Sequence, residues 1–288
     1  MQLEQSLKKE MWLNEYIENA LREDIGDGDH TSRACIPPDA VSTAKLLVKE
    51  PGVIAGVEVA EHIFQKVDKT SKITIFKKDG DDVSKGDIAF VVEANTRALL
   101  VAERLVLNTM QRMSGIATLS NRFLFEVEDL PVSILDTRKT TPNIRFLEKW
   151  AVRLGGCENY RFGLFDRIMI KDNHIKACGS IRKAIEQVEA YQEASNLDLP
   201  VTIEVANLMQ LYEVLEVGSI QRIMFDNFEL PLLKEGVAIV DKRYETEASG
   251  GINIHNVRKF ALTGVDFISV GSLTHSAISM DMSLKIIS

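Results

Sequence analysis

The sequence predicts an α/β protein with a small N-terminal α/β unit followed by a barrel of parallel strands, complete or one or two strands short. From residue 132 to the end of the chain, short apolar runs alternate with helical patterns, and strict alternation implies a parallel sheet with right-handed crossovers. Between residues 43 and 93, the apolar runs are separated by glycine-containing turns, which indicates short strands. Several runs of the second part end in charge, as buried strands do when their carboxyl ends open on a site.

The N-terminal part begins with a helical pattern over residues 2–23, and Gly26 follows as a stop. The acidic turn at residues 23–32 resembles a calcium loop but lacks the distal glutamate of an EF-hand, so we expect a structural role for it. The other elements predicted here are a helix over residues 57–67 and strands over residues 44–48, 52–56, 73–76 and 88–92.

A long helix is predicted over residues 98–126, and a break near Ser114-Gly115 is left open. The elements expected after it are strands over residues 132–135, 168–170, 201–205, 222–225, 244–248 and 267–270, with helices over residues 144–154, 180–194, 208–216 and 254–262. We expect an N-terminal domain at residues 1–115 and the barrel at residues 116–288, with a C-terminal helix returning to the N-terminal domain.

Composition limits the classes of partner. The chain has 288 residues, a net charge of -8 and a pI of about 5.3, which argues against a protein that coats nucleic acid or an anionic membrane. Residues 138–176 nevertheless carry nine basic and four acidic side chains, so we expect a local binding site for a small anion. The N-terminus mixes charge through every turn and predicts neither a signal peptide nor a membrane span, and three distant cysteines indicate a reducing compartment, so the prediction is a cytoplasmic protein.

Polar residues at the predicted strand ends indicate three tasks. Glycines at Ser249-Gly250-Gly251 and Gly271 precede helical stretches and suit a phosphate group. Glu204 and Asp226 are hard carboxylates on neighbouring strands, which suit Mg²⁺ carried in by a polyphosphate. The positive charge comes from Arg138, Lys139, Arg161 and Lys171, where arginine clamps carboxylates bidentately and lysine acts as a point charge. Together these tasks suggest a phosphorylated sugar and an acid as substrates.

The motifs that carry a family resemblance are Thr137-Arg138-Lys139-Thr140-Thr141-Pro142, Gly155-Gly156-Cys157-Glu158-Asn159-Tyr160-Arg161, Lys171-Asp172-Asn173-His174, Glu247-Ala248-Ser249-Gly250-Gly251-Ile252 and Ser269-Val270-Gly271. In combination they resemble the quinolinate phosphoribosyltransferases, also called nicotinate-nucleotide pyrophosphorylases, over nearly the whole chain. The resemblance implies an N-terminal α/β sandwich domain and an incomplete, TIM-like α/β barrel. It also implies a reaction with Mg²⁺ in which quinolinate and phosphoribosyl pyrophosphate give nicotinate mononucleotide, pyrophosphate and CO₂.

The same resemblance implies roles for individual residues. Lys139, Lys171, Glu204 and Asp226 are the expected catalytic residues, and Glu204 and Asp226 also surround the metal and ribose. The quinolinate pocket is expected to contain Arg138, Lys139, Tyr160, Arg161 and Lys171, with Arg104 arriving from the partner chain of a homodimer; a hexamer is left open. The expected 5′-phosphate region contains Ser249, Gly250, Gly251, Gly271 and His275.

Two positions depart from the family pattern, and they keep alternatives open. Tyr160 stands where the family usually has histidine, and Cys157 replaces the usual third glycine of that loop. A phenol can still satisfy a carboxylate oxygen, but it stays neutral at pH 7. One alternative is therefore the related family linked to molybdenum transport, or another barrel phosphoribosyl enzyme acting on a different acid. The other is a non-catalytic carrier, suggested by hairpins like those of lipoyl domains, although Lys77 and Lys78 precede the turn instead of occupying its tip.

Overall fold

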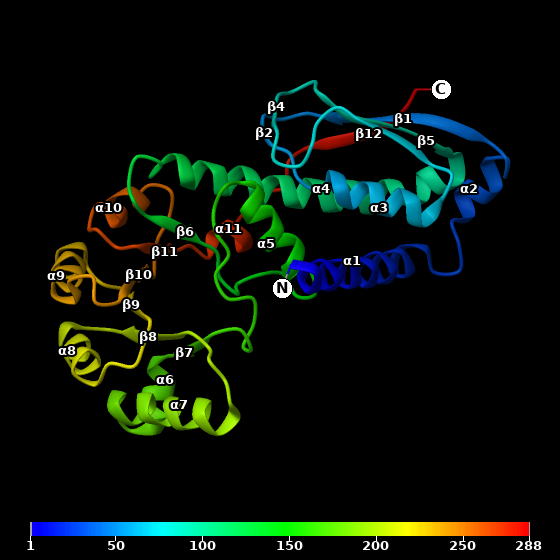
Figure 1. Cartoon of the computed structure of the whole chain (residues 1–288). Helices are drawn as coiled ribbons and strands as arrows, with labels where there is room; N and C mark the ends of the chain where they lie inside the picture. The colour runs from blue at the N-terminus through cyan, green and yellow to red at the C-terminus, as the bar shows by residue number, and fades with distance from the viewer. Residues whose placement is uncertain (1, 288) are drawn as a thin grey trace. The chain divides into compact units, whose positions relative to one another are not determined.

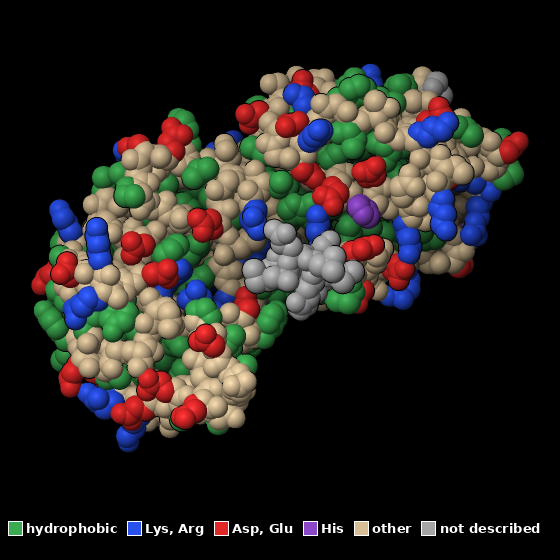
Figure 2. Space-filling model, viewed as in Figure 1, with side chains coloured by type: hydrophobic (Ala, Val, Ile, Leu, Met, Phe, Trp, Pro, Cys, Tyr) green, Lys and Arg blue, Asp and Glu red, His purple; other side chains and the backbone are tan. Residues whose placement is uncertain are grey.

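The computed structural model describes residues 2–287 and has the mixed α/β architecture that the sequence predicts, with one antiparallel and one parallel main sheet (Figure 1). The chain forms two compact units. The first combines the residues up to Asn121 with Thr140–Gly156 and the residues from Thr274 onward, and the second combines Arg122–Lys139 with Cys157–Leu273. The boundary expected between residues 115 and 116 falls inside helix α4, which runs unbroken over Thr96–Phe125. Figure 2 shows acidic and basic side chains interspersed on the face that it displays.

The first unit is built on a four-stranded antiparallel sheet in the order β12-β1-β5-β3. Its strands are β1 (Val41–Val48), β3 (Lys72–Ile75), β5 (Ile88–Asn95) and β12 (Met282–Ile286), beside a small pair formed by β2 (Gly52–Val53) and β4 (Asp82–Val83). Its helices are α1 (Gln2–Ile25), α2 (His30–Cys35), α3 (Val57–Val67), most of α4, and α5 (Arg145–Leu154). Alternate side chains of β1, including Ala44, Leu46 and Val48, are fully buried, which is the pattern of a strand with one face on a core.

The end of the chain differs from the expectation. The predicted C-terminal helix is instead strand β12, which pairs antiparallel with β1 so that Leu284 lies opposite Leu46. Met282 and Leu284 are buried, whereas Ser283 between them is not, so the segment has the two-residue period of a strand. Pairing with β1 supplies the backbone hydrogen bonds that an isolated C-terminal segment of this length lacks.

The second unit is built on a six-stranded parallel sheet in the order β6-β11-β10-β9-β8-β7. The strands are β6 (Ser133–Leu135), β7 (Ile168–Ile170), β8 (Val201–Val205), β9 (Arg222–Asp226), β10 (Glu245–Ser249) and β11 (Phe267–Ser269). The helices that connect or follow them are α6 (Asp172–Cys178), α7 (Ile181–Ser195), α8 (Leu208–Val217), α9 (Leu230–Val240), α10 (Val257–Ala261) and α11 (Ser272–His275). Between residues 2 and 287 no strand pairing joins β6 to β7, and the outer side of β6 instead forms a parallel bridge between Leu135 and Glu158.

Burial explains why the central strands of this sheet are apolar almost throughout. Ile203 of β8 and Ile223 of β9 are fully buried, and most of their neighbours along these two strands are buried as well. Strands of a parallel sheet are covered on both faces, so they lose the polar-apolar alternation seen in β1. The charged residues Arg222 and Glu247 in β9 and β10 are exceptions that need partners inside the unit.

An ion pair joins α10 to the turn before β6. Arg258 donates bidentately to Asp129, with 2.7 and 2.8 Å between nitrogen and oxygen. This contact holds the pKa of Asp129 at about 2, below its ordinary value. Because the folded pKa is depressed, the pair stabilises the fold above pH ~4 and the stabilisation is lost as the pH falls towards 2. We expect Asp129→Asn to flatten the pH dependence of the unfolding free energy in this window, measured by urea denaturation. An unchanged slope would contradict the expectation, and added salt should shrink the difference since the pair is exposed.

Candidate active site

Lys171 and Glu204 meet at the carboxyl ends of β7 and β8. Lys171 follows the last residue of β7, and its ammonium donates a hydrogen bond to Glu204 Oε1. The Glu204 side chain is 12% exposed and that of Lys171 is 42% exposed, so the pair has one buried and one open partner. The two strands are neighbours in parallel register, which places their carboxyl ends together.

Arg161 lies close enough to the same carboxylate, and to Arg138, to interact with both electrostatically. Burial first, and the guanidinium of Arg138 second, lower the pKa of Arg161, whereas Asp166 and Glu204 act in the opposite direction. Arg161 is half-buried, and its Nη1 donates to the main-chain oxygen of Arg167 at 3.2 Å. Lys171 thus binds Glu204 directly, and Arg161 interacts electrostatically with Glu204 and with Arg138, although these cations are up to 33 positions apart in the sequence. Like charges held this close favour a polyanionic ligand.

The chain turns sharply beside Arg138. The main-chain N–H of Lys139 donates to Thr137 Oγ1 at 3.0 Å, a local turn that ends the extension of β6. Two residues later, in the first compact unit, the N–H and hydroxyl of Thr141 donate to Glu148 at 3.0 and 2.8 Å. Glu148 is fully buried and also accepts two hydrogen bonds from Arg112. Sequence reasoning missed Glu148 and Arg112, because nothing in a helical pattern distinguishes a buried acid from an exposed one.

The ends of β9 and β10 interlock through Asn227 and Gly250. The N–H of Asn227 donates to the Ser249 carbonyl at 2.9 Å, and its side-chain amide donates to Asp226 at 3.0 Å. Gly250 has a φ of +101°, and a Cβ there would lie 2.2 Å from Asn227 Oδ1. Gly251 also has a positive φ, of +63°, but faces open space. Only glycine allows this close approach of the two strand ends.

The loop after Gly251 is closed by asparagines. The Gly251 carbonyl accepts hydrogen bonds from the side-chain amides of Asn253 at 3.5 Å and Asn256 at 3.1 Å. Gly271 follows β11 and directly precedes the short helix α11. The candidate phosphate residues Ser249, Gly250, Gly251 and Gly271 thus stand at the carboxyl ends of adjacent strands β10 and β11.

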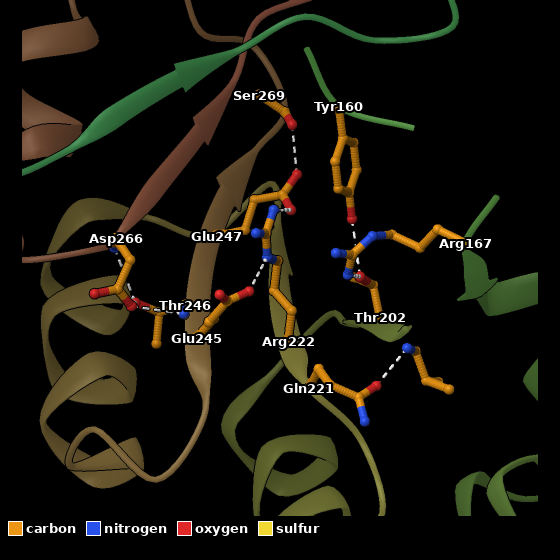
Figure 3. Close-up of polar contacts among 11 residues, drawn as sticks. Tyr160, Arg167, Thr202, Gln221, Arg222, Glu245, Thr246, Glu247, Asp266 and Ser269 are labelled. Atoms are coloured by element: carbon orange, nitrogen blue, oxygen red, sulfur yellow. Dashed lines mark hydrogen bonds and ion pairs between the residues drawn. The ribbon is translucent and has the colours of Figure 1, made fainter. Parts of the chain in front are cut away.

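Tyr160 points away from these strand ends into the interior of the second unit (Figure 3). Its N–H donates to the fully buried Asp136 at 2.8 Å, and its hydroxyl lies 2.9 Å from Thr202 Oγ1, near the amino end of β8. The guanidinium carbons of Arg167 and Arg222 lie 5.5 and 5.2 Å from the centre of its ring. Burial first, and the Glu247 carboxylate second, raise the pKa of Tyr160, so the phenol stays protonated.

Arg222 and Glu247 form a buried ion pair beside Tyr160, as Figure 3 shows. Arg222 Nη1 donates to Glu247 at 3.2 Å, its Nε donates to Glu245 at 2.8 Å, and its guanidinium lies over the ring of Phe267. Glu247 is fully buried and also accepts a hydrogen bond from the hydroxyl of Ser269. Burial raises the pKa of Glu247, and the hydrogen bonds and Arg222 oppose the rise. The sequence analysis assigned no role to this pair, although charged residues inside apolar strands are a usable signal.

Cys157 is buried and carries no nucleophile at neutral pH. Burial, followed by the carboxylates of Asp136 and Glu158, raises the pKa of its thiol to about 12. A protonated thiol is a poor nucleophile and a poor metal ligand. The Cys157 thiol therefore contributes packing volume in this loop.

Comparison with known proteins decides the family. The C-terminal domain of quinolinate phosphoribosyl transferase matches residues 116–285, and its N-terminal domain matches residues 29–114. The chain belongs to the quinolinate phosphoribosyltransferase family. The similarity to the mitochondrial decarboxylating quinolinate phosphoribosyltransferase 2 of Nicotiana glauca is 45% identity over 95% of this chain and 82% of that protein. The probable carboxylating nicotinate-nucleotide pyrophosphorylase of Bacillus subtilis is 40% identical over 95% of this chain and 93% of that protein.

Solved structures of the quinolinate phosphoribosyltransferase family share the fold. NadC from Streptococcus pyogenes superimposes with a TM-score of 0.90 at 37% identity, covering 96% of this chain and 97% of that one. The nicotinate-nucleotide pyrophosphorylase from Ehrlichia chaffeensis gives the same TM-score at 39% identity, covering 95% and 98%. The predicted fold class and the family resemblance are therefore confirmed.

The carboxylates of this phosphoribosyltransferase fit a metal that arrives with its substrate. Glu204 and Asp226 stand near the ends of adjacent strands β8 and β9. Across residues 2–287, no group of three or more His, Cys, Asp or Glu side chains could hold a metal ion by itself. Mg²⁺ commonly binds to one or two carboxylates and completes its shell with water and substrate phosphates, so two acids are a sufficient donor set.

Two predicted site residues of the phosphoribosyltransferase lie in the first compact unit, and their place in the site stays a prediction. Arg104 is an exposed residue of α4, and His275 ends α11, with its Nδ1 2.7 Å from the hydroxyl of Ser276.

No helix in the described range 2–287 is both long enough and apolar enough to cross a bilayer.

Gly250→Ala is expected to destabilise the enzyme by about 1–3 kcal/mol, since the new methyl group meets Asn227 and the residue must keep its positive φ. Gly251→Ala is the matched control, with a positive φ but open space around the new Cβ, and its cost is expected to be about 1 kcal/mol. Urea denaturation of both variants measures the difference. Equal losses would show that contact with Asn227 does not constrain position 250.

Proposed function

We propose that this protein transfers the phosphoribosyl group of phosphoribosyl pyrophosphate to quinolinate and decarboxylates the product, which gives nicotinate mononucleotide, pyrophosphate and CO₂. Membership of the quinolinate phosphoribosyltransferase family supports the reaction. The observation that carries the assignment to a site is the contact of Lys171 with Glu204, together with the electrostatic interaction of Arg161 with Glu204 and with Arg138. Quinolinate has two adjacent carboxylates, and clustered cations bind such an anion more strongly than a monocarboxylate.

The cations hold the acid and position it for attack. Arg138, Lys139, Arg161 and Lys171 bind the two carboxylates, with arginine forks fixing the plane of the ring. The ring nitrogen then faces C1 of the ribose and forms the new C–N bond while the C1–O bond to pyrophosphate breaks. No protein nucleophile is required, so proximity and charge stabilisation account for the rate. When a quinolinate carboxylate binds to Lys171, it takes the place of Glu204, and the Glu204 carboxylate can then turn towards the ribose.

Decarboxylation follows from the charge that the first step creates. The alkylated ring nitrogen is positive and stabilises the electron pair that the broken C2–carboxylate bond leaves on C2, so CO₂ departs and a proton adds to C2. Glu204 and Asp226 would hold Mg²⁺ and the ribose hydroxyls, and the chemistry that Mg²⁺ supplies when bound is neutralisation of the pyrophosphate charge. Ser249, Gly250, Gly251, Gly271 and His275 would bind the 5′-phosphate through backbone and side-chain donors.

The assembly and the compartment are further parts of this proposal. We propose a homodimer in which Arg104 of one protomer completes the site of its partner, with a hexamer as the larger alternative. Mixing Arg104→Ala and Lys171→Ala proteins tests it, because a shared site restores about a quarter of wild-type activity by statistical exchange of subunits. We also propose a cytoplasmic location, supported by the sparse and widely separated cysteines Cys35, Cys157 and Cys178. Cell fractionation tests this, since the Nicotiana glauca relative is named as mitochondrial.

A chromatographic assay tests the reaction itself. Wild-type protein with quinolinate, phosphoribosyl pyrophosphate and Mg²⁺ should form nicotinate mononucleotide, and nicotinate in place of quinolinate should give none. The alternative of a molybdenum-transport-linked relative acting on another acid predicts no product from quinolinate. The comparisons favour the first outcome. Product formed by Tyr160→His but not by the wild type would overturn the assignment of quinolinate as the substrate.

A further inference from the structure

Thr202 lies one layer beneath the carboxylate of the proposed acid site. Thr202 and Glu204 are separated by one residue in β8, so their side chains leave the same face of the strand, with about 7 Å between their Cα atoms. Glu204 accepts from Lys171, whereas Thr202 contacts Tyr160 and Arg167. Thr202 is fully buried, so its hydroxyl has no solvent to replace these partners.

Hydrogen bonds link Thr202 to two neighbouring side chains. Arg167 Nη1 donates to Thr202 Oγ1, at 3.1 Å, because a guanidinium has no acceptor. The hydroxyls of Thr202 and Tyr160 share a hydrogen bond of 2.9 Å, in which either oxygen can be the donor. A side-chain hydrogen bond with Tyr160 also lowers the pKa of Glu247. A continuous hydrogen-bonded chain therefore joins Arg167, Thr202, Tyr160 and Glu247.

Two members of this chain, Tyr160 and Arg167, adjoin Arg161. Tyr160 precedes Arg161 directly, and its main-chain N–H is held by Asp136. Arg167 accepts a hydrogen bond from Arg161 on its carbonyl while its own side chain is held by Thr202. Arg161 thus follows Tyr160 in the chain and donates to the carbonyl of Arg167, and the side chains of both residues are held by the hydroxyl of Thr202.

We propose that Thr202 is a positioning residue for the proposed reaction, which fixes Arg161 for carboxylate binding through Tyr160 and Arg167 without touching either substrate. The inference rests on the proposed function. Removing the hydroxyl takes away the acceptor of Arg167 Nη1 and one hydrogen-bond partner of the Tyr160 phenol, so both side chains must move to find another. The ion pair between Arg222 and Glu247 does not involve Thr202, so the interior keeps its main polar contact.

Thr202→Val tests the proposal, because valine has the shape of threonine without its hydroxyl. We expect the KM for quinolinate and the dissociation constant of quinolinate, measured by calorimetry, to rise about tenfold. The KM for phosphoribosyl pyrophosphate should stay within about twofold of the wild-type value, and kcat within about threefold. Neither the phosphate-binding residues nor Glu204 is changed by this substitution. Thr202→Ser keeps the hydroxyl and should restore the wild-type KM for quinolinate.

Thr246→Val is the matched control. Thr246 is a buried threonine of β10 whose hydroxyl donates to Asp266 at 2.6 Å, and it has no contact in the chain that leads to Arg161. It should lose stability without a selective change in the KM for quinolinate. If Thr202→Val does not fold, Tyr160→Phe takes its place in the test. We expect the same result from it: a higher KM for quinolinate and an unchanged KM for phosphoribosyl pyrophosphate.

Three results would overturn the proposal while wild-type activity remains: an unchanged KM for quinolinate in Thr202→Val, an equal rise in the KM of both substrates, or an equal rise in Thr246→Val. A wild-type protein that forms no nicotinate mononucleotide from quinolinate would instead refute the proposed function.

Discussion

Arg161→Gln is expected to lower kcat/KM for quinolinate by about 10²- to 10³-fold, since it removes the partly buried guanidinium that is proposed to bind a quinolinate carboxylate. The guanidinium lies beside Arg138 and Glu204, where burial already lowers its pKa. Hydrogen bonds to a carboxylate are stronger there than in water, and glutamine supplies one amide donor group without charge. The affinity for phosphoribosyl pyrophosphate should change little, because the glycine-rich strand ends of β10 and β11 are not altered.

Steady-state kinetics with each substrate varied in turn measures this effect. Arg182→Gln is the control, because Arg182 is an exposed arginine of α7 in the same unit, paired with Glu216 at 2.8 Å. That variant should keep wild-type kinetics. A similar loss in both variants, or a loss confined to phosphoribosyl pyrophosphate, would remove Arg161 from the acid site.

Arg222→Met is expected to cost about 3–5 kcal/mol of unfolding free energy, because it leaves a buried carboxylate without its counter-charge. Arg222 is 5% exposed and Glu247 is fully buried, so water cannot replace the lost partner. Only the hydroxyl groups of Ser269 and Tyr160 then remain to hydrogen-bond to Glu247. Urea denaturation at constant pH measures the loss.

The pH dependence of this variant has a definite sign. Burial raises the pKa of Glu247 in the folded protein, and Arg222 opposes that rise, so its removal raises the pKa further. The folded state then binds a proton that the unfolded state has released, and stability falls as the pH rises above the ordinary glutamate value of about 4.5. Arg222→Met should therefore lose more stability at pH 7 than at pH 5. Adding Glu247→Gln should recover part of the loss at pH 7, and no recovery would mean that the buried charge is not its cause.

Local patterns predicted most of the second unit correctly. Short apolar runs with intervening helical periods gave β7, β8 and β9 within about one residue, because each element is long enough to show its own period. The C-terminal strand β12 was the main error. Its five residues have two inward-facing apolar positions, and only the pairing with β1, more than 230 positions away, favours a strand over a helix.

The order of residues along the chain is sufficient for the α/β class, for the cations Arg138 and Lys171 after strand ends, and for the family motifs that include Arg161, because each is a local pattern. The tertiary structure alone decides which of these cations share Glu204 and where Tyr160 directs its hydroxyl. A tyrosine at the mouth of a barrel can point to the ligand or into the interior, and its direction depends on partners from other strands. Here Thr202, Arg167 and Glu247 supply those partners, and burial makes each unmet hydrogen bond costly.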